Sequence, residues 1–186
     1  GLGVRVVKGD ATGYAYVEDL AFDSMARAAQ TAANIAAGSQ QKVAPVFVTP
    51  NSGSRYRVPL LSLDVPGLDK RALLERADKR ARAADSRVVR VDASLSEEIR
   101  EILVATSDGK IAFDSQPLLR FGVRVIVESG GKRESGGSGG GGRIGLDYFD
   151  GRSPEWHADE AVRQALVMLD AREAPTGEME VVLGPG

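Results

Sequence analysis

Alternation of apolar and polar residues predicts strands at the beginning of this chain and through its second half. Residues 3–7 alternate, a Lys-Gly-Asp turn follows, and residues 13–17 alternate again, which predicts a β-hairpin. Three other stretches have apolar residues at helical spacing, which predicts helices over about 24–37, 70–84 and 159–169. The sequence therefore predicts a mixture of strands and helices along the chain.

The second half of the chain predicts a sheet of consecutive antiparallel strands. From residue 87 the sequence alternates as far as 106, and Asp108-Gly109 is then a strong signal for a tight hairpin turn. Alternation resumes, with an expected break at Gln116-Pro117, and continues to a second turn at Gly130-Gly131. These segments are too closely spaced for helical crossovers, which argues against a parallel doubly wound sheet. The expected fold class is α+β: mainly an antiparallel sheet, a meander, packed with a few helices.

The pattern also predicts short extended segments and a division into two domains. Strands are expected at 43–48 and 179–183, and residues 144–149 form a short apolar piece that we expect to be extended. The change of pattern near residue 87 predicts an amino-terminal α/β subdomain over residues 1–86. An antiparallel sheet with a helix is expected over residues 87–186.

Composition narrows the classes of partner. The 186 residues are 42% hydrophobic and 27% charged, which suits a packed core with a solvated surface. The net charge of −2 gives no general attraction to nucleic acid or to anionic membranes, and we expect direct contact with neither. The sequence has no run of about 20 apolar residues that could span a bilayer. Cysteine is absent, which removes thiolate chemistry and favours a reducing compartment, so we expect a cytoplasmic protein.

The helix predicted at 70–84 has a basic face. It carries six lysines and arginines, interrupted by Glu75 and Asp78. A basic helix could bind nucleic acid or an acidic partner, but no aromatic residues interleave with these charges. We therefore expect a solvated surface helix.

The candidates for catalysis within this sequence are few. A zinc site would need the single histidine, His157, together with carboxylates, and a Ser-His-Asp triad would also have to use it. His157 follows Trp156 at the start of a predicted helix, where we expect it to be exposed. The pairs Glu97-Glu98 and Asp159-Glu160 are expected to be solvated, and Ser135 and Ser138 have no visible base. No catalytic residue and no metal ligand is assigned.

A run of six glycines and one serine occupies residues 136–142, with Arg133 and Arg143 close to its ends. Glycine costs backbone entropy on folding, so such a run suits a backbone that turns sharply, flexes or lies against another chain. A phosphate loop would need Lys-Ser or Lys-Thr opening a helix, and a dinucleotide fingerprint would need a helix after the glycines. The run is also compatible with a disordered tip, or with a surface where an extended peptide adds as a strand.

Three stretches of the chain, in order, resemble the TldD branch of the TldD/PmbA family, whose members were once labelled modulators of DNA gyrase. The first is the early hairpin, Gly3–Val7 with Gly13–Tyr16. The second is Gly131–Glu134 with Gly139–Gly145. The third consists of Ala161–Leu166, Ala174–Gly177 and Val181–Gly186.

The resemblance implies a zinc metallopeptidase that trims peptides beside a related non-catalytic subunit. Family members carry a His-Glu-x-x-x-His motif soon after the equivalent of residues 181–186, so no catalytic or metal residue is carried over to this sequence. The zinc implied by the family would belong to the full-length protein, and this chain would be its amino-terminal part. The expected partners are a peptide substrate and a homologous PmbA-type subunit or homodimer partner. A non-catalytic subunit or binding module of such a complex, and an anion-binding domain, remain competing hypotheses.

Within that resemblance, the glycine run is expected to border the path of the peptide. Its backbone has little side-chain bulk and lies between two arginines. The candidate substrate-binding residues are Arg133, Gly139, Gly140, Gly141 and Arg143.

Overall fold

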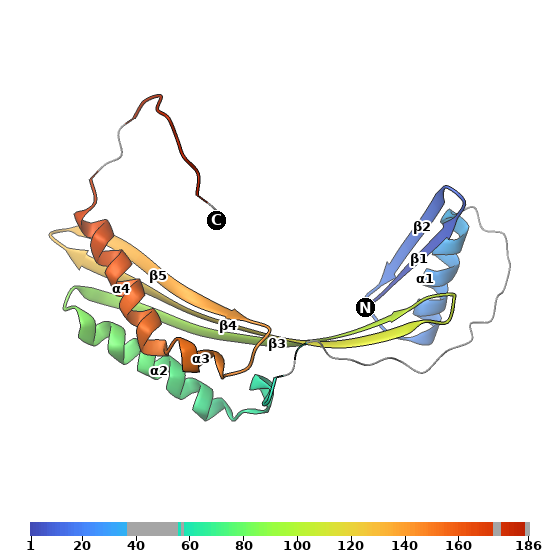
Figure 1. Cartoon of the computed structure of the whole chain (residues 1–186), viewed down its shortest axis with the longest axis horizontal. Coiled ribbons are helices and arrows are strands. Elements are labelled where there is room, and N and C mark those ends of the chain that lie inside the picture. Colours follow the sequence, from blue (N-terminus) through green and yellow to red (C-terminus); the bar gives the residue numbers. More distant parts are fainter. Residues whose placement is uncertain (37–55, 57, 173–175, 185–186) are drawn as a thin grey trace. The chain divides into compact units, whose positions relative to one another are not determined.

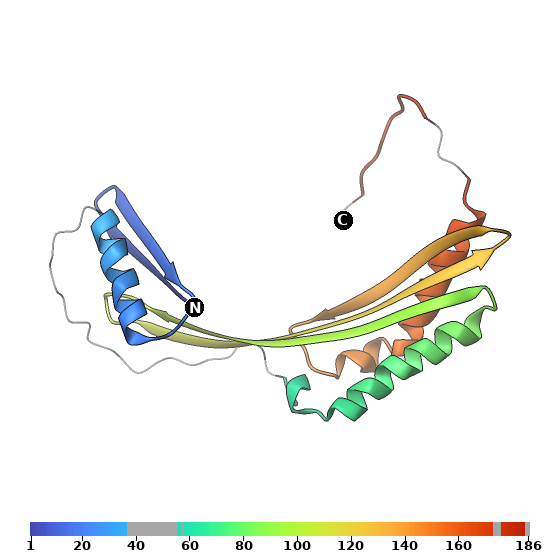
Figure 2. The same cartoon turned by 180° about the vertical axis from the view of Figure 1, so that it is seen from behind.

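The computed structural model describes residues 1–36, 56, 58–172 and 176–184, and it has the expected α+β fold (Figures 1 and 2). Its elements divide into two compact units. The described part of the first unit is residues 1–36 with 107–109, and the remaining described residues form the second. The strand predicted at 43–48 lies outside the described residues.

The first unit consists of a hairpin and one helix. Strand β1 (Leu2–Lys8) pairs antiparallel with β2 (Ala11–Val17), as the alternation predicted, and α1 (Phe22–Ile35) follows. Ala28 and Ala32 are buried on the helix. A Cβ atom at Gly13 would overlap the carbonyl oxygen of Ala32, so glycine allows the strand to approach the helix backbone.

The second unit is built on a three-stranded antiparallel meander, which confirms the predicted sheet. Its strands are β3 (Val88–Ala105), β4 (Ile111–Ser129) and β5 (Lys132–Gly142), in the order β3-β4-β5. Both predicted turns are present: Gly109 has a φ of +87°, and Gly130 and Gly131 have φ of +57° and +79°. These are left-handed conformations that glycine adopts without steric cost.

The expected break at Gln116-Pro117 was wrong, because β4 continues through it with Pro117 opposite Ile99 of β3. Strand β5 pairs only with Leu119–Ser129 of β4. Among the described residues, β4 at Pro117 therefore has a neighbouring strand on one side only. A proline, which has no N–H to donate, is tolerated at such a position.

Two helices, α2 (Gly67–Ala84) and α4 (Pro154–Asp170), cover one face of this sheet. In Figure 1, α4 crosses in front of the strands. Alternate β4 residues point into the core between helices and sheet, and small helix residues pack against them. The buried members are Phe121, Val123, Val125 and Val127 of β4, Ala77 and Ala81 of α2, and Ala158, Ala161, Val162 and Ala165 of α4. The short helices η1 (Ser62–Asp64) and α3 (Tyr148–Gly151) complete the unit.

The basic face of α2 is partly paired rather than simply solvated. Arg76 donates to both carboxylate oxygens of Glu155 on α4, at 2.6 and 2.8 Å. Arg80 donates to Asp159 of α4 at 2.7 and 3.1 Å. The side chain of Asp159 is 44% exposed, so it lies at the surface and is also ion-paired. These ion pairs link the two helices along their outer surfaces.

Glu97 also differs from expectation. It lies on the covered face of β3, where its side chain is 17% exposed and pairs with Lys70. Between residues 91 and 99 of β3 the odd-numbered residues lie on this face, so Glu97 and Glu98 have opposite environments.

The strand expected at 179–183 was wrong, because residues 178–184 lie in no helix or strand. Val182 is 96% exposed and Leu183 is 88% exposed. A strand requires hydrogen bonds to a neighbouring strand, and the described residues provide none beside this segment.

Two further expectations concern the chain as a whole. Residues 86 and 87, at the predicted domain division, lie between α2 and β3, which both belong to the second unit. Among the described residues, no helix is both long enough and apolar enough to cross a membrane.

Candidate functional site

The glycine run forms most of strand β5, which lies at an edge of the sheet. Gly139, Gly140 and Gly141 are paired with Gly122, Phe121 and Arg120 of β4. The run is therefore not a disordered tip. It is also extended over its length instead of looping at the start of a helix, which does not match a phosphate loop. The segment expected to be extended after it, residues 144–149, instead leads into α3.

The two sides of β5 have different surroundings. On the covered side, a Cβ atom at Gly136 would overlap the carbonyl oxygen of Ala161, and one at Gly140 would overlap the hydroxyl of Tyr148. Glycine is needed there because α4 and α3 lie directly on the strand. On the other side, a Cβ atom at Gly137 would lie 3.6 Å from the carbonyl oxygen of Val123, an ordinary contact. At Gly137 that side of the strand therefore has room for a side chain.

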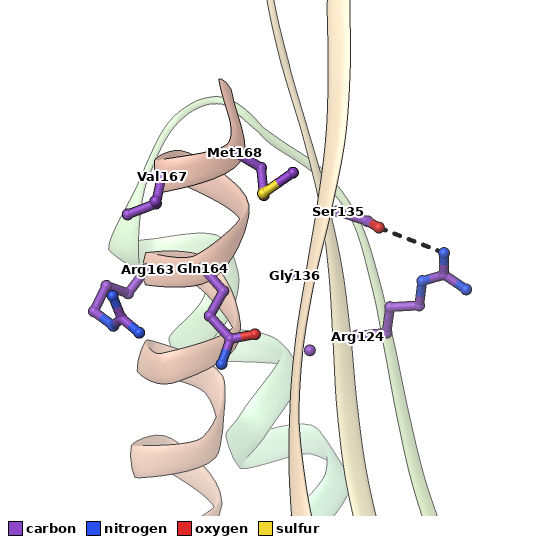
Figure 3. Close-up of a pocket in the computed structure, with 8 residues that line it drawn as sticks. Arg124, Ser135, Gly136, Arg163, Gln164, Val167 and Met168 are labelled. Carbon is purple, nitrogen blue, oxygen red and sulfur yellow. Dashed lines mark hydrogen bonds between the residues drawn. The ribbon is translucent and has the colours of Figure 1, made fainter. Parts of the chain in front are cut away.

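A groove lies where the edge of β5 meets the outer side of α4 (Figure 3). We call it the edge groove. It has a volume of about 550 Å³, and its lining consists of Arg124, Ser135, Gly136, Gly137, Arg163, Gln164, Val167 and Met168. Figure 3 shows Gln164 and Met168 directed toward β5.

The lining of the edge groove combines backbone with a mixed set of side chains. Glu160 accepts a hydrogen bond from the amide of Gln164 at 2.8 Å, which orients that side chain. Arg124 donates to the hydroxyl of Ser135 at 3.4 Å. Met168 is 46% exposed and Val167 is 55% exposed, so apolar surface is accessible beside the strand edge. Such a groove suits an extended chain that pairs with backbone and rests its side chains on apolar surface.

Two contacts hold α4 against β5 at either end of the edge groove. At one end, Lys132 donates to the carbonyl oxygens of Met168, Leu169 and Ala171 at 3.3, 2.8 and 3.4 Å, which caps the end of α4. At the other end, the ring of His157 on α4 is hydrogen-bonded to Ser138 of β5. Residues 135–137 lie between these two points, so the width of the groove is fixed on both sides.

His157 is buried with 0% exposure, and the expectation of an exposed histidine was wrong. Its Nδ1 lies 2.8 Å from the Ser138 hydroxyl oxygen, and its Nε2 lies 2.8 Å from the Tyr148 hydroxyl oxygen. Burial lowers the pKa of His157, and the positive charge of Arg152 lowers it further. The neutral ring links β5, α3 and α4 and is not open to a substrate.

The burial of His157 has a local cause in the sequence. Ser153 caps α4 by accepting a hydrogen bond from the backbone N–H of Trp156 at 3.2 Å, and Pro154 occupies the first turn. The helix therefore begins at residue 154, five residues earlier than predicted. This start places His157 one turn before Ala161 on the covered face. The Ser-Pro pair was the signal that could have shown it.

The five candidate residues for substrate binding do not gather at one point. Gly139, Gly140 and Gly141 share a second hollow of about 430 Å³ with Leu118–Arg120 and Gly142. Arg133 is exposed near the β4–β5 turn, opposite Glu128. The guanidinium carbon of Arg143 lies 5.1 Å from the centre of the Tyr56 ring. Substrate binding by these five residues stays a prediction.

The donor chemistry of this chain does not fit a zinc site. The described residues contain no group of three or more His, Cys, Asp or Glu side chains placed to hold a metal ion. Both ring nitrogens of the single histidine are already hydrogen-bonded to protein groups. A metal that acts with this chain would have to be held by other residues.

Comparison with known proteins gives consistent matches along the chain. Residues 61–169 match the profile of the PmbA/TldA metallopeptidase central domain, and residues 1–36 match that of PmbA/TldA metallopeptidase domain 1. A protein of Haemophilus influenzae described as a metalloprotease TldD homolog is 44% identical over 195 aligned residues, which cover 100% of this chain. A Buchnera aphidicola protein with the same description is 38% identical over 197 aligned residues, which also cover 100% of this chain.

The chain spans 40% of the length of each of these two relatives. A solved structure from Thermotoga maritima, described as a candidate modulator of a DNA gyrase, has the same fold, with a TM-score of 0.66 at 17% identity. That alignment covers 94% of this chain and 39% of the other.

Proposed function

The chain belongs to the PmbA/TldD metallopeptidase family, and we propose that it forms the substrate- and partner-binding part of a peptide-cleaving member of that family. The observation that carries the proposal is the edge groove, which places free strand edge beside apolar side chains. In the full-length protein, a zinc ion held by residues outside this chain would activate the water that attacks the peptide bond.

The role of this chain would be to hold the substrate in an extended conformation. The edge of β5 that faces away from β4 has no strand beside it among the described residues, so its outward backbone groups are available for pairing. A peptide that adds as a further strand would be recognised mainly through its backbone. Because the lining residues of β5 are Ser135, Gly136 and Gly137, the peptide would meet little side-chain bulk on that strand.

The contacts at the ends of the groove support binding without reorganisation. Lys132 and His157 hold α4 at a set distance from β5 before any peptide arrives. A binding site that is already in its bound geometry loses less conformational entropy when it is occupied. This arrangement favours a peptide site over a groove that merely separates two elements.

The proposal is tested by filling the edge groove with Met168→Trp in the full-length protein. The indole would occupy space beside Ser135, so we expect KM for an unstructured peptide to rise roughly tenfold while kcat changes little. The matched control is Arg71→Trp, which adds the same ring on α2 where the arginine side chain is 71% exposed. If Met168→Trp left KM and kcat unchanged, the edge groove would not be part of the peptide-binding site.

Valine substitutions at Gly139 and Gly141 are a weaker test of the same idea. A Cβ atom at Gly139 would lie 2.7 Å from the carbonyl oxygen of Phe121, and Gly141 has a φ of +144°. Both changes would disturb the sheet itself, so a loss of activity would not distinguish binding from folding. Met168 and Gly137 are better positions because each has room for a larger side chain.

We also propose that a homologous subunit, either of PmbA type or a second copy of the protein, is the protein partner. The support is family membership, since such partners are what the resemblance implies. Light scattering on the purified full-length protein, alone and mixed with its family partner, would test this. A monomer under both conditions would contradict it.

A further inference from the structure

The three-stranded sheet of the second unit has one face that α2 and α4 do not cover. This face carries a shallow hollow of about 430 Å³. Its floor is a row of residues directly opposite one another across three strands: Ser94 of β3, Gly122 of β4 and Gly139 of β5. Arg120 and Arg124 lie two residues to either side of Gly122 on β4, and both line the hollow. We call this the cross-strand hollow.

The charges around the cross-strand hollow do not balance. Asp92 of β3 lines the hollow opposite Arg124, but its carboxylate is paired with Arg90 at 2.9 Å, and Glu98 of β3 is paired with Arg100 at 2.8 Å. Arg124 donates only to the neutral hydroxyl of Ser135, at 3.4 Å. Arg120 has no hydrogen bond or ion pair to any residue that the structure describes. Two guanidinium groups therefore flank the hollow, and neither forms an ion pair with a residue that the structure describes.

We propose that the cross-strand hollow binds an acidic side chain of a peptide, with its carboxylate above Gly122 and a guanidinium group on either side. Residues two apart on a strand are separated by about 6.7 Å, so both arginines can reach a group centred on Gly122. The glycines of the floor have no side chain to prevent the peptide from approaching the sheet. Guanidinium groups form strong charge-assisted hydrogen bonds with carboxylates. The inference rests on the proposed function and adds a charge preference to it.

A peptide fits this hollow better than a nucleic acid does. Single-stranded nucleic acids are held by aromatic side chains on which the bases stack, together with basic groups that follow the backbone. The lining includes one aromatic residue, Phe121, and its side chain is 1% exposed because it points into the core on the other face. The chain as a whole has a net charge of −2. The positive charge is local, which suits a single carboxylate.

The proposal is tested with two fluorescent peptides that differ only in having glutamate or glutamine at the same positions. Binding to the full-length protein is followed by anisotropy, in the presence of a chelator so that no peptide is cleaved. We expect the glutamate peptide to bind roughly threefold to tenfold more tightly, with a difference that shrinks as salt is added. Arg120→Gln and Arg124→Gln should each reduce that preference, and the double variant should abolish it.

Arg100→Gln is the matched control, because Arg100 is on the same face but already paired with Glu98. It should leave the preference intact. The double variant with Arg120→Glu and Arg124→Glu should instead prefer a lysine peptide, which shows that charge and not fold is responsible.

Several outcomes would overturn the proposal. Equal affinity of the unmodified protein for both peptides would contradict this inference but not the proposal that the edge groove binds peptides. The inference would also be contradicted if the Arg120 and Arg124 variants kept the full glutamate preference. If Met168→Trp at the same time lost binding to both peptides, the edge groove would still be supported as the peptide site. Failure of the unmodified protein to bind either peptide would contradict the proposed function as well. Tighter, arginine-dependent binding of a single-stranded oligonucleotide would assign the hollow to phosphate.

Discussion

Both sides of strand β5 are rich in glycine, but their surroundings differ. Gly136 and Gly140 face the helices, and side chains there would overlap Ala161 and Tyr148. Gly137 faces the opposite way and has room for a side chain that it does not carry. Packing against the helices explains the glycines of the covered side, whereas no packing contact explains the glycine at position 137. The proposed function gives a reason for glycine at position 137, which is to let a peptide approach the sheet.

The largest expected effect separates these two sides by stability. Gly136→Val should destabilise the fold by about 3 kcal/mol or more, because the new side chain must displace α4 from the sheet. Gly137→Val should leave stability unchanged or raise it by about 0.5 kcal/mol, because valine suits a strand better than glycine. Urea denaturation measures both. Equal destabilisation by the two substitutions would remove the distinction between the sides.

The second prediction concerns the contact that holds the covered side together. His157→Ala should destabilise the fold by about 2–3 kcal/mol, because it leaves a cavity and removes the ring that bonds Ser138 and Tyr148. Trp156→Ala is the control at the next position, where the side chain is 46% exposed, and its effect should be clearly smaller. A larger loss for Trp156 would contradict the assigned burial of His157.

The third prediction uses pH. The pKa of folded His157 is lowered below its ordinary value of 6.5, so the unfolded chain binds more protons than the folded chain in the interval between the two values. The stability from the neutral buried ring is complete above about pH 6.5 and decreases as the pH falls below it. We expect the free energy of unfolding to decrease as the pH is lowered from 7 to 5. His157→Gln should remove this slope, and a slope that persists would assign it to other groups.

The smallest expected effect concerns an exposed ion pair between α2 and α4, the two helices that cover the sheet. The hydrogen bonds from Arg76 lower the pKa of Glu155 to about 2, so the stability from this pair is present above about pH 4.5 and is lost as the pH falls toward 2. The side chains are 51% and 34% exposed, so Arg76→Gln should cost only about 0.5 kcal/mol at pH 7. NMR titration should show the pKa of Glu155 returning toward 4.5. Peptide binding should be unaffected, and a weakened affinity would mean that the two sides are coupled.

Much of the fold could be predicted from alternation and turn residues. The meander, the two tight turns and the early hairpin follow from local pattern, because each depends on neighbouring residues in the sequence. The course of β4 through Pro117 could not be predicted, because it depends on where a different strand, β5, ends. The strand expected at 179–183 failed for a related reason, since strand formation needs a partner that local pattern does not supply.

The predicted role of the glycine run in substrate binding stays a prediction, whereas its surroundings could not be predicted. The glycine run was expected to border the path of a peptide, and the edge groove that the structure shows is lined by the first half of this run and by α4, which lies later in the sequence. The roles of Lys132, His157 and Arg120 were missed. Each depends on a contact between elements distant in sequence, or on the absence of an acidic partner, and neither can be seen in one sequence.

The central claim is that an extended peptide pairs with the free edge of β5. Hydrogen exchange of the full-length protein, measured with and without a saturating unstructured peptide and with a chelator present to prevent cleavage, tests it most directly. We predict that alternate amides of residues 133–141, those that point away from β4, exchange roughly tenfold or more slowly when the peptide is bound. The amides of β3, at the other edge of the sheet, should not change. Unchanged exchange along β5 with the peptide bound would contradict the account.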